Sequence, residues 1–330
     1  MSYGEIIEFI IINTQQKYHK DINLKLNEIE KAKKETYVIF NPEGGLGKII
    51  ASTAVLKFIQ KKYPEHKIIV ITPWAEMFLN NPRVHRVYKT GNHPYFYKDY
   101  IEGRESILLK GEPYFNSKHM YQKQHLIQSW CELHDLEFDG NVKPELYFTK
   151  PELEYYAANI GDDGRPILAM QTNGGMFEND KQYCWTRDIP HNQAQILVNE
   201  LSKVYRILHV TRPNCPVLEN TERVDSIPNK RTFIAMLLRS QKRLLIDSCL
   251  QHAAAAFDLP STVCWVGTSP DTFGYDMHTN ITPTKEKQNV ASGMIDSLFF
   301  DNDFNGPEYE YPYEDFDIFN LQTIFNSLTQ

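Results

Sequence analysis

The segment from residue 244 to residue 270 constrains the fold of this chain most. Residues 244–246 form a short apolar run typical of a buried strand, and Asp247 with Ser248 provides a helix start. An Ala-rich helix follows, a Leu-Pro pair ends it, and a second apolar run leads to Gly-Thr-Ser-Pro. This order predicts a parallel sheet, in which strand carboxyl ends and helix amino ends together form the ligand-binding edge.

The start of this helix is a candidate anion-binding site, because free N–H groups and the helix dipole favour negative charge there. Asp247 lies at the start itself. His252 follows five residues later, about one and a half turns along the helix. We therefore expect Asp247 and His252 to line the same site.

The segment resembles the carboxyl-terminal signature of the heptosyltransferase-like glycosyltransferases, family 9. That signature reads Asp-(Ser/Thr)-Gly-x-x-His-x-Ala-Ala-Ala, then a Pro and a strand ending in Phe-Gly-x-Thr-x-Pro. The matching residues are Asp247, Ser248, His252, 254–256, Pro260, Gly267, Thr268 and Pro270, whereas Cys249 replaces the usual Gly. The resemblance implies an α/β GT-B fold, with two Rossmann-like, doubly wound domains facing a central cleft. Another Rossmann-type protein with a capped helix is the alternative.

Composition agrees with a two-domain protein. The chain has 330 residues, 42% of them hydrophobic, and no apolar run long enough to span a membrane. Its net charge of −7 argues against a generally basic nucleic-acid surface, although residues 296–317 carry much of the acidity. The five cysteines show no Cys-x-x-Cys spacing, which favours a reducing cytoplasm over a zinc site or a disulfide framework.

Alternating apolar runs and helical patterns divide the chain into four segments. Residues 1–35 read as a helical leader, 36–160 as a Rossmann-like acceptor domain, and 161–290 as a Rossmann-like nucleotide-sugar donor domain. Within the first domain we expect a strand at 37–41 and one long helix at 118–135. Residues 291–330 form an acidic aromatic tail with a final helix. This helix is expected to pack back on the first domain, or the tail is a disordered interaction segment.

The first glycine-rich loop, Gly44-Gly45-Leu-Gly47-Lys48, follows the first strand. It is not a Walker A loop, because the upstream Gly and the final Ser or Thr are missing. It resembles the family's acceptor-side loop, Gly-x-Gly-Asp, but Lys48 stands where the family carries an Asp that is taken as the general base. An ordinary Lys is protonated at neutral pH and cannot accept a proton.

Three interpretations of Lys48 follow. Lys48 binds an anionic acceptor or the leaving diphosphate, which is the favoured interpretation because a cation at a helix start needs a nearby anion. Alternatively, another carboxylate is the base, for which Glu43, Asp99 and Glu102 are the candidates. In the third interpretation the chain no longer catalyses transfer.

A second loop, residues 171–187, resembles the family segment that reaches the donor phosphates. Asn173, Gly174 and Gly175 would let backbone N–H groups approach a diphosphate. Lys181 and Arg187 would neutralise the departing nucleoside diphosphate, with Arg212 as a weaker candidate at the next strand end. A solvated loop whose charges serve only solubility is the alternative.

The sequence therefore predicts a glycosyltransferase that moves a sugar from a nucleotide-diphosphate donor to an acceptor hydroxyl. The resemblance implies inversion by direct displacement, without a metal or another cofactor. The expected acceptor is a saccharide or a lipopolysaccharide-type glycan. The alternatives are sugar transfer to a modified base in DNA, a non-catalytic nucleotide-sugar-binding module and a Rossmann enzyme of another class.

Overall fold

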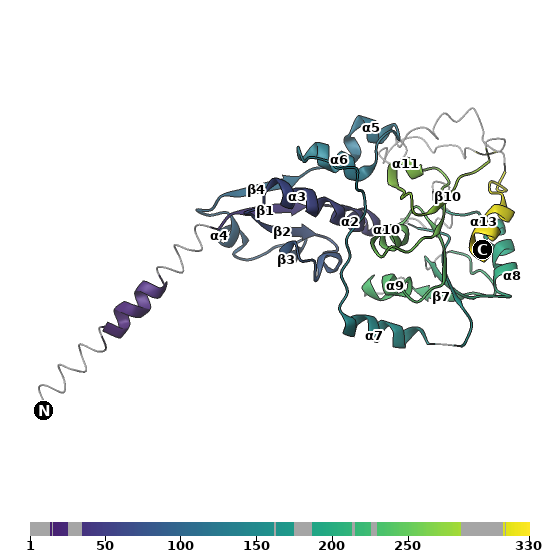
Figure 1. Cartoon of the computed structure of the whole chain (residues 1–330), viewed down its shortest axis with the longest axis horizontal. Coiled ribbons are helices and arrows are strands. Elements are labelled where there is room, and N and C mark those ends of the chain that lie inside the picture. The colour runs from purple at the N-terminus through teal and green to yellow at the C-terminus, as the bar shows by residue number, and fades with distance from the viewer. Residues whose placement is uncertain are drawn as a thin grey trace, which may run out of the picture.

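The computed structural model describes residues 14, 16–25, 35–161, 163–174, 187–212, 215–225, 230–284, 313 and 315–330. Residues 16–25 form an exposed helix ahead of the first strand (Figure 1). Most of the other described residues belong to two parallel sheets and the helices around them. No helix in these ranges is long and apolar enough to cross a membrane.

The first sheet has four parallel strands in the order β3-β2-β1-β4. Its strands are β1 (Tyr37–Asn41), β2 (Lys67–Thr72), β3 (Val84–Lys89) and β4 (Ser106–Lys110). Val and Ile dominate β1 and β2, as expected for strands buried on both faces. Because β2 and β4 flank β1 on opposite sides, the chain reverses its direction of winding between β1 and β4. Such a switch point is where doubly wound sheets bind ligands.

Helices cover the two faces of this sheet unequally. On one face, α2 (Leu46–Ser52), the 3-10 turn η1 (Thr53–Val55) and α3 (Leu56–Lys62) run on from β1 and pack on Val38 and Phe40. The other face carries the short helix α4 (Phe96–Tyr100). Its Tyr100 ring packs edge-on against Tyr37 at the amino end of β1. Therefore α4 lies toward the strand ends opposite the glycine-rich loop.

The helix expected at 118–135 is wrong as a single element. The chain instead forms η3 (Pro113–Phe115), α5 (Ser117–Met120) and α6 (Leu126–Leu133). Just after α5, Gln122 adopts a left-handed backbone with a φ of 54°, so the helix cannot continue. The His125 ring then caps α6 by accepting from the Ile127 N–H at 3.2 Å. A polar capping residue in mid-pattern thus broke an otherwise helical sequence.

The connection between the two sheets is α7 (Lys150–Ile160) followed by a turn. A capping box starts α7, because the Thr149 side chain accepts from the Glu152 N–H while Glu152 accepts from the Thr149 N–H. Gly161 ends the helix with a φ of 67°, which suits glycine. Strand β5 (Ile167–Gln171) then begins the second sheet.

The second sheet has six parallel strands in the order β10-β9-β8-β5-β6-β7. The other five strands are β6 (Arg206–Thr211), β7 (Glu222–Asp225), β8 (Lys242–Ile246), β9 (Thr262–Cys264) and β10 (Thr279–Ile281). Here β6 and β8 flank β5, so the switch point lies between β5 and β8. The two edge strands, β7 and β10, are short and were not expected from the sequence.

Alternate residues of the second sheet enter two separate cores. Residues such as Ala169 and Leu245 face α9 (Lys230–Met236) and α10 (Cys249–Ala256), whereas Met170 and Leu244 face the other layer. That other layer consists of α8 (His191–Leu201) and the final helix α13 (Leu321–Thr329) (Figure 1). The expectation that the final helix packs on the first domain is therefore wrong. Ile324 and Leu328 of α13 instead pack in the same cluster as Leu244 and Ile246 of β8.

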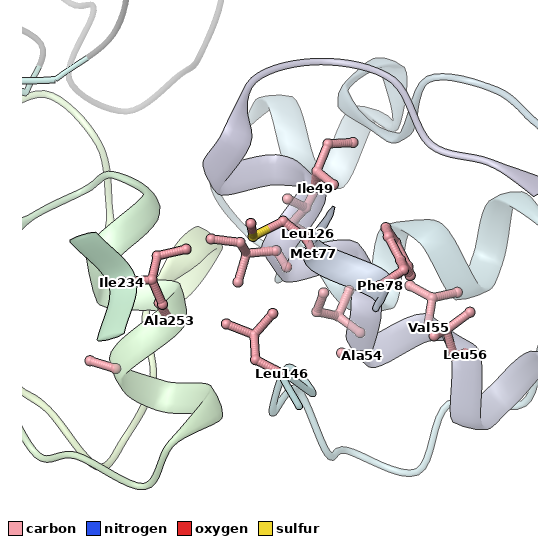
Figure 2. Packing of buried hydrophobic residues seen from close by; sticks show 14 of the residues in the cluster. Ile49, Ala54, Val55, Leu56, Met77, Phe78, Leu126, Leu146, Ile234 and Ala253 are labelled. Carbon is pink, nitrogen blue, oxygen red and sulfur yellow. The ribbon is translucent and has the colours of Figure 1, made fainter. Parts of the chain in front are cut away.

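The two domains share a continuous apolar core. Figure 2 shows Ile234 and Ala253 on second-domain helices facing Ile49, Met77 and Leu126 of the first domain. Helix α10 also contacts α2 extensively. The predicted α/β fold with two Rossmann-like domains is confirmed, and the helices that follow the two switch points pack against each other.

Candidate active site at the facing ends of the two sheets

The second-domain switch point brings together two segments that the sequence predicted separately. Gln171, the last residue of β5, donates from its amide to the Ser248 hydroxyl at 3.1 Å. A Cβ built on Gly174 would lie 3.0 Å from the Ser248 Oγ, so any larger residue would require the Ser248 side chain to shift. The two predicted donor-binding segments therefore meet where doubly wound sheets bind nucleotides.

Ser248 differs from its expected role. It occupies the N-cap position of α10, but its side chain makes no capping hydrogen bond. Its hydroxyl instead accepts the amide of Gln171 and so joins β8 to β5. Asp247, 4% exposed, precedes it at the carboxyl end of β8, and its charge contributes to raising the pKa of the buried Tyr275 phenol.

A charged network orders the loop after β5. The guanidinium of Arg212 forms an ion pair with the Asp188 carboxylate at 2.5 Å, and both side chains are largely buried. Asp188 also accepts the Gly174 N–H at 3.1 Å, while Asn173 accepts the Arg212 N–H at 2.8 Å. The Arg212 charge thus compensates Asp188, and together they fix the glycine backbone that was predicted to approach a diphosphate.

A pocket adjoins this network at the carboxyl ends of β5 and β6. Its lining is Thr172, Asn173, Asp188, Ile189, His191, Ala194, Cys215 and Pro216. One further residue supports this lining, because the His209 Nε2 and the Thr172 hydroxyl are hydrogen-bonded at 2.8 Å. The lining combines hydrogen-bonding groups with apolar side chains such as Ile189 and Ala194.

Thr268 lies in the loop after β9, at the same edge of the sheet. Its side chain is 7% exposed, and its hydroxyl has no hydrogen-bond partner among the described residues. A buried hydroxyl normally finds a partner, so an unsatisfied one calls for an explanation. A bound ligand at this edge would supply one.

His252 is buried in α10 and is uncharged. Its Nδ1 is hydrogen-bonded to the Tyr275 hydroxyl at 2.8 Å. Burial lowers the pKa of His252 to about 3, with smaller contributions from His125, His278 and Arg187. Therefore His252 acts here as a neutral hydrogen-bonding residue, and Arg187 lies within electrostatic range of it.

Gly47 is a point of close approach between the domains. A Cβ built on it would lie 3.2 Å from the Cys249 nitrogen and 3.3 Å from the His252 Cδ2. These distances are shorter than ordinary carbon contacts, so a side chain at position 47 would push α2 away from α10. The glycine-rich loop, which was expected on the acceptor side, is thus in direct contact with α10, which was expected on the donor side.

Gly44 has a different role in the same loop. Its φ is 118°, a backbone region that favours glycine, and a Cβ there would lie 2.9 Å from the Lys48 Cδ. Gly45 is the N-cap of α2, and a Cβ there would meet no atom within 4 Å. The loop therefore turns at Gly44 and directs the Lys48 stem beneath it.

Lys48 forms an ion pair across the first switch point. Its Nζ lies 2.5 Å from both carboxylate oxygens of Glu112, a residue just beyond the end of β4. The Lys48 side chain is 8% exposed, and its ammonium lies 4.3 Å from the centre of the Tyr114 ring. Burial lowers the pKa of Lys48, and Glu112 opposes this effect. The anion that a cation at this helix start requires is Glu112 itself.

The carboxylates that the sequence offered as bases lie elsewhere. Glu43 is half-exposed and pairs with Lys110 at 3.1 Å on the rim of the first sheet. Asp99 is exposed on α4, near the amino ends of the strands, and Glu102 is exposed in the turn that follows. The structure therefore does not bring Asp99 or Glu102 to the glycine-rich loop.

Two predicted donor-binding residues, Gly175 and Lys181, lie outside the described residues. The sequence analysis missed two charged residues that the structure places at the candidate site, Asp188 and Glu112. A signal for Glu112 exists, because Gly111-Glu112-Pro113 directly follows β4 and so lies at the ligand-binding edge. Asp188 had no comparable signal, because it does not directly follow a strand and its partner Arg212 lies 24 residues later, at the end of β6.

Comparisons with known proteins find similar structures but no similar sequences. No family model and no curated protein sequence matches the chain. A family 9 glycosyltransferase from Veillonella parvula matches with a TM-score of 0.61 and 12% identity, over 88% of this chain and 95% of that one. The ADP-heptose lipopolysaccharide heptosyltransferase II of E. coli matches with a TM-score of 0.57 and 13% identity, over 74% and 89%.

The iron-containing dodecameric glycosyltransferase TibC of enterotoxigenic E. coli matches with a TM-score of 0.53 and 11% identity. The alignment covers 74% of this chain but 62% of TibC. At such identities the likeness is one of fold. This chain has the two-domain GT-B fold of the heptosyltransferase-like family 9 glycosyltransferases.

Proposed function

We propose that this chain is a glycosyltransferase that uses a nucleotide-diphosphate sugar. The observation that carries the proposal is the meeting of residues 171–174 with Asp247 and Ser248 at the β5–β8 switch point. A diphosphate there would lie at the amino end of α10, beside Asp247 and Ser248, where free helix N–H groups and the helix dipole favour an anion. The shared fold supports this assignment of the second domain as the donor domain.

The reaction that we propose is direct displacement at the anomeric carbon with inversion, without a metal. The acceptor hydroxyl would approach from the first domain, because the Gly44–Lys48 loop faces α10. A saccharide acceptor is proposed because one structural relative is named for transfer to lipopolysaccharide. Transfer to a modified base in DNA stays an untested alternative.

A ligand panel tests the donor assignment. ADP, UDP and GDP, with ADP-heptose, ADP-glucose, UDP-glucose and GDP-mannose, would be compared by thermal shift and calorimetry. A ligand at 100 times its dissociation constant should stabilise the fold by about 2.7 kcal/mol. Absence of binding by every member of this panel would contradict the proposal.

Two variants locate the site once a ligand binds. Asp247→Asn and Gly174→Val should each weaken binding, because one alters the end of β8 and the other pushes against Ser248. Asp271→Asn, an exposed change in α11 (Pro270–Phe273), is the matched control and should bind normally. Equal affinity in all three proteins would place the donor elsewhere.

A further inference from the structure

Glu112 is a carboxylate fixed at the first switch point. It follows β4 by two residues, and its side chain receives Lys48 Nζ on both oxygens and the Tyr114 N–H on Oε1 at 3.1 Å. These contacts hold the plane of the carboxylate. Its neighbour Glu43, in contrast, is half-exposed and meets one flexible Lys.

The contacts of Glu112 leave it able to accept one more hydrogen. A carboxylate has about four lone-pair positions. Among the described residues, Lys48 and Tyr114 occupy three of these positions, and 35% of the Glu112 side chain remains exposed. One acceptor position is therefore left for a hydroxyl group from outside the protein.

The position of Glu112 relative to the second domain suits an acceptor site. Tyr114, two residues away, lies 6.0 Å from Phe273 of the second domain between ring centres. The partner Lys48 belongs to α2, which packs on α10 beside Asp247 and Ser248. Glu112 thus lies at the junction of the domains, on the side of the proposed donor site.

We infer that Glu112 is the general base of the sugar transfer and that Lys48 is its positioning residue. This inference rests on the proposed function. The Glu112 carboxylate takes the proton of the acceptor hydroxyl as that oxygen bonds to the anomeric carbon. The bond from this carbon to the diphosphate oxygen breaks, and its electron pair leaves with the nucleoside diphosphate. Glu112 then returns its proton to solvent.

A base at Glu112 accounts for Lys48, which stands where the Gly-x-Gly-Asp loop of the resembling family has its Asp. Lys48 cannot serve as a base, but it holds the Glu112 carboxylate at the same loop. The loop therefore still presents a carboxylate, which now comes from the segment after β4 instead of from α2. Sequence comparison of this loop alone would have classed the chain as lacking a base.

The test is release of nucleoside diphosphate from ADP-heptose, ADP-glucose, UDP-glucose and GDP-mannose, with water as the acceptor. Glu112→Gln should lower turnover about 100-fold or more while donor affinity is unchanged. The acidic limb of the pH–rate profile should disappear in this variant. Lys48→Met should lower turnover less and shift that limb, because the carboxylate remains but is no longer held.

A double variant separates catalysis from structure. Lys48→Met with Glu112→Gln has no uncompensated charge at the junction, so it should regain the stability lost by Glu112→Gln alone. If Glu112 is the base, the double variant is folded, binds donor and remains inactive. Recovery of wild-type turnover would reduce the pair to a structural ion pair and overturn the inference.

Two further variants complete the test. Glu137→Gln, which removes an exposed ion pair with Lys61, should keep full turnover. The Glu43→Gln variant should also stay active. If Glu43→Gln were inactive while Glu112→Gln kept its turnover, the general base would be Glu43. Lack of turnover by the wild-type protein with all four sugars would overturn the proposed function, and with it the role of Glu112. Turnover that survives Glu112→Gln would overturn the base assignment alone.

Discussion

The Arg231 guanidinium and the Glu152 carboxylate form an ion pair at 2.8 Å that joins α9 to the connecting helix α7. Arg231 is 2% exposed and also donates to the backbone oxygens of Glu76 and Tyr147. Its guanidinium lies 3.8 Å from the centre of the Phe148 ring. One side chain of the second domain therefore holds three segments that precede that domain.

The loss of this side chain should destabilise the whole protein. Arg231→Met should lower the free energy of unfolding by about 3 kcal/mol, because Glu152 loses its cationic partner and the carbonyls of Glu76 and Tyr147 lose their guanidinium donor. Denaturant titration measures the loss. Arg165→Ala removes an ion pair with the surface residue Asp163 and should leave the midpoint nearly unchanged. Equal midpoints for both variants would show that the Arg231 contacts do not secure the domains.

Gly47 and Gly45 allow a matched test of the domain contact. Gly47→Ala should destabilise the protein by about 1–3 kcal/mol, because its methyl group would crowd Cys249 and His252. Gly45→Ala adds the same group two residues earlier, where no atom lies within 4 Å, so its effect should be smaller. Thermal unfolding of both variants measures the difference. A larger loss for Gly45→Ala would contradict the packing described at Gly47.

Buried histidines at the domain junction predict a loss of stability in mild acid. Burial lowers the pKa of His119, His125 and His278 to about 4 and that of His252 to about 3, against an ordinary value of 6.5. As the pH falls below 6.5, the unfolded chain binds protons that the folded chain cannot accept. Stability is therefore complete above pH 6.5 and declines toward pH 4.

The measurement is the unfolding midpoint between pH 7.5 and pH 4.5. His119→Phe should make the decline shallower, because it removes one titrating ring whose Nε2 has no partner among the described residues. The aromatic contacts of His119 with Tyr114 and Phe273 can persist in this variant. A decline as steep as that of the wild type would mean that His119 is not one of the responsible groups.

The position of α13 predicts a strong effect of one residue near the carboxyl terminus. Ile324 is fully buried against the second sheet, so Ile324→Ala should cost about 2–5 kcal/mol in the free energy of unfolding. Gln322→Ala, on the exposed side of the same helix, is the control. Calorimetric unfolding would show the loss. Equal stability of the two variants would mean that α13 does not cover the sheet in solution.

Much of the fold could be predicted because its signals are local. The apolar run at 37–41 matches β1 residue for residue, and Asp247 does lie between a buried strand and its helix. The single helix at 118–135 failed because the caps of α5 and α6 interrupt its periodicity. The site of α13 could not be predicted, because an apolar helix face does not identify the surface that it covers.

The candidate site was only partly predictable for a related reason. Residues 171–174 and Asp247 could be chosen because each follows a strand in the chain. The partner of Lys48 is 64 residues away, and the partner of Arg212 is 24 residues away. Which charges meet depends on strand order, and the hydrophobic pattern of single strands does not encode that order.

The packed contact between α2 and α10 also limits how the two halves of this protein can move. Wide opening would expose apolar residues such as Ile49, Leu126 and Ile234 to water, at roughly 25 cal/mol for each Å² uncovered. Small rotations about Gly47, which has no side chain to obstruct them, would keep that surface covered. Relative motion of the two domains should therefore be limited to pivoting at this contact, so that the domains remain packed against each other while they move.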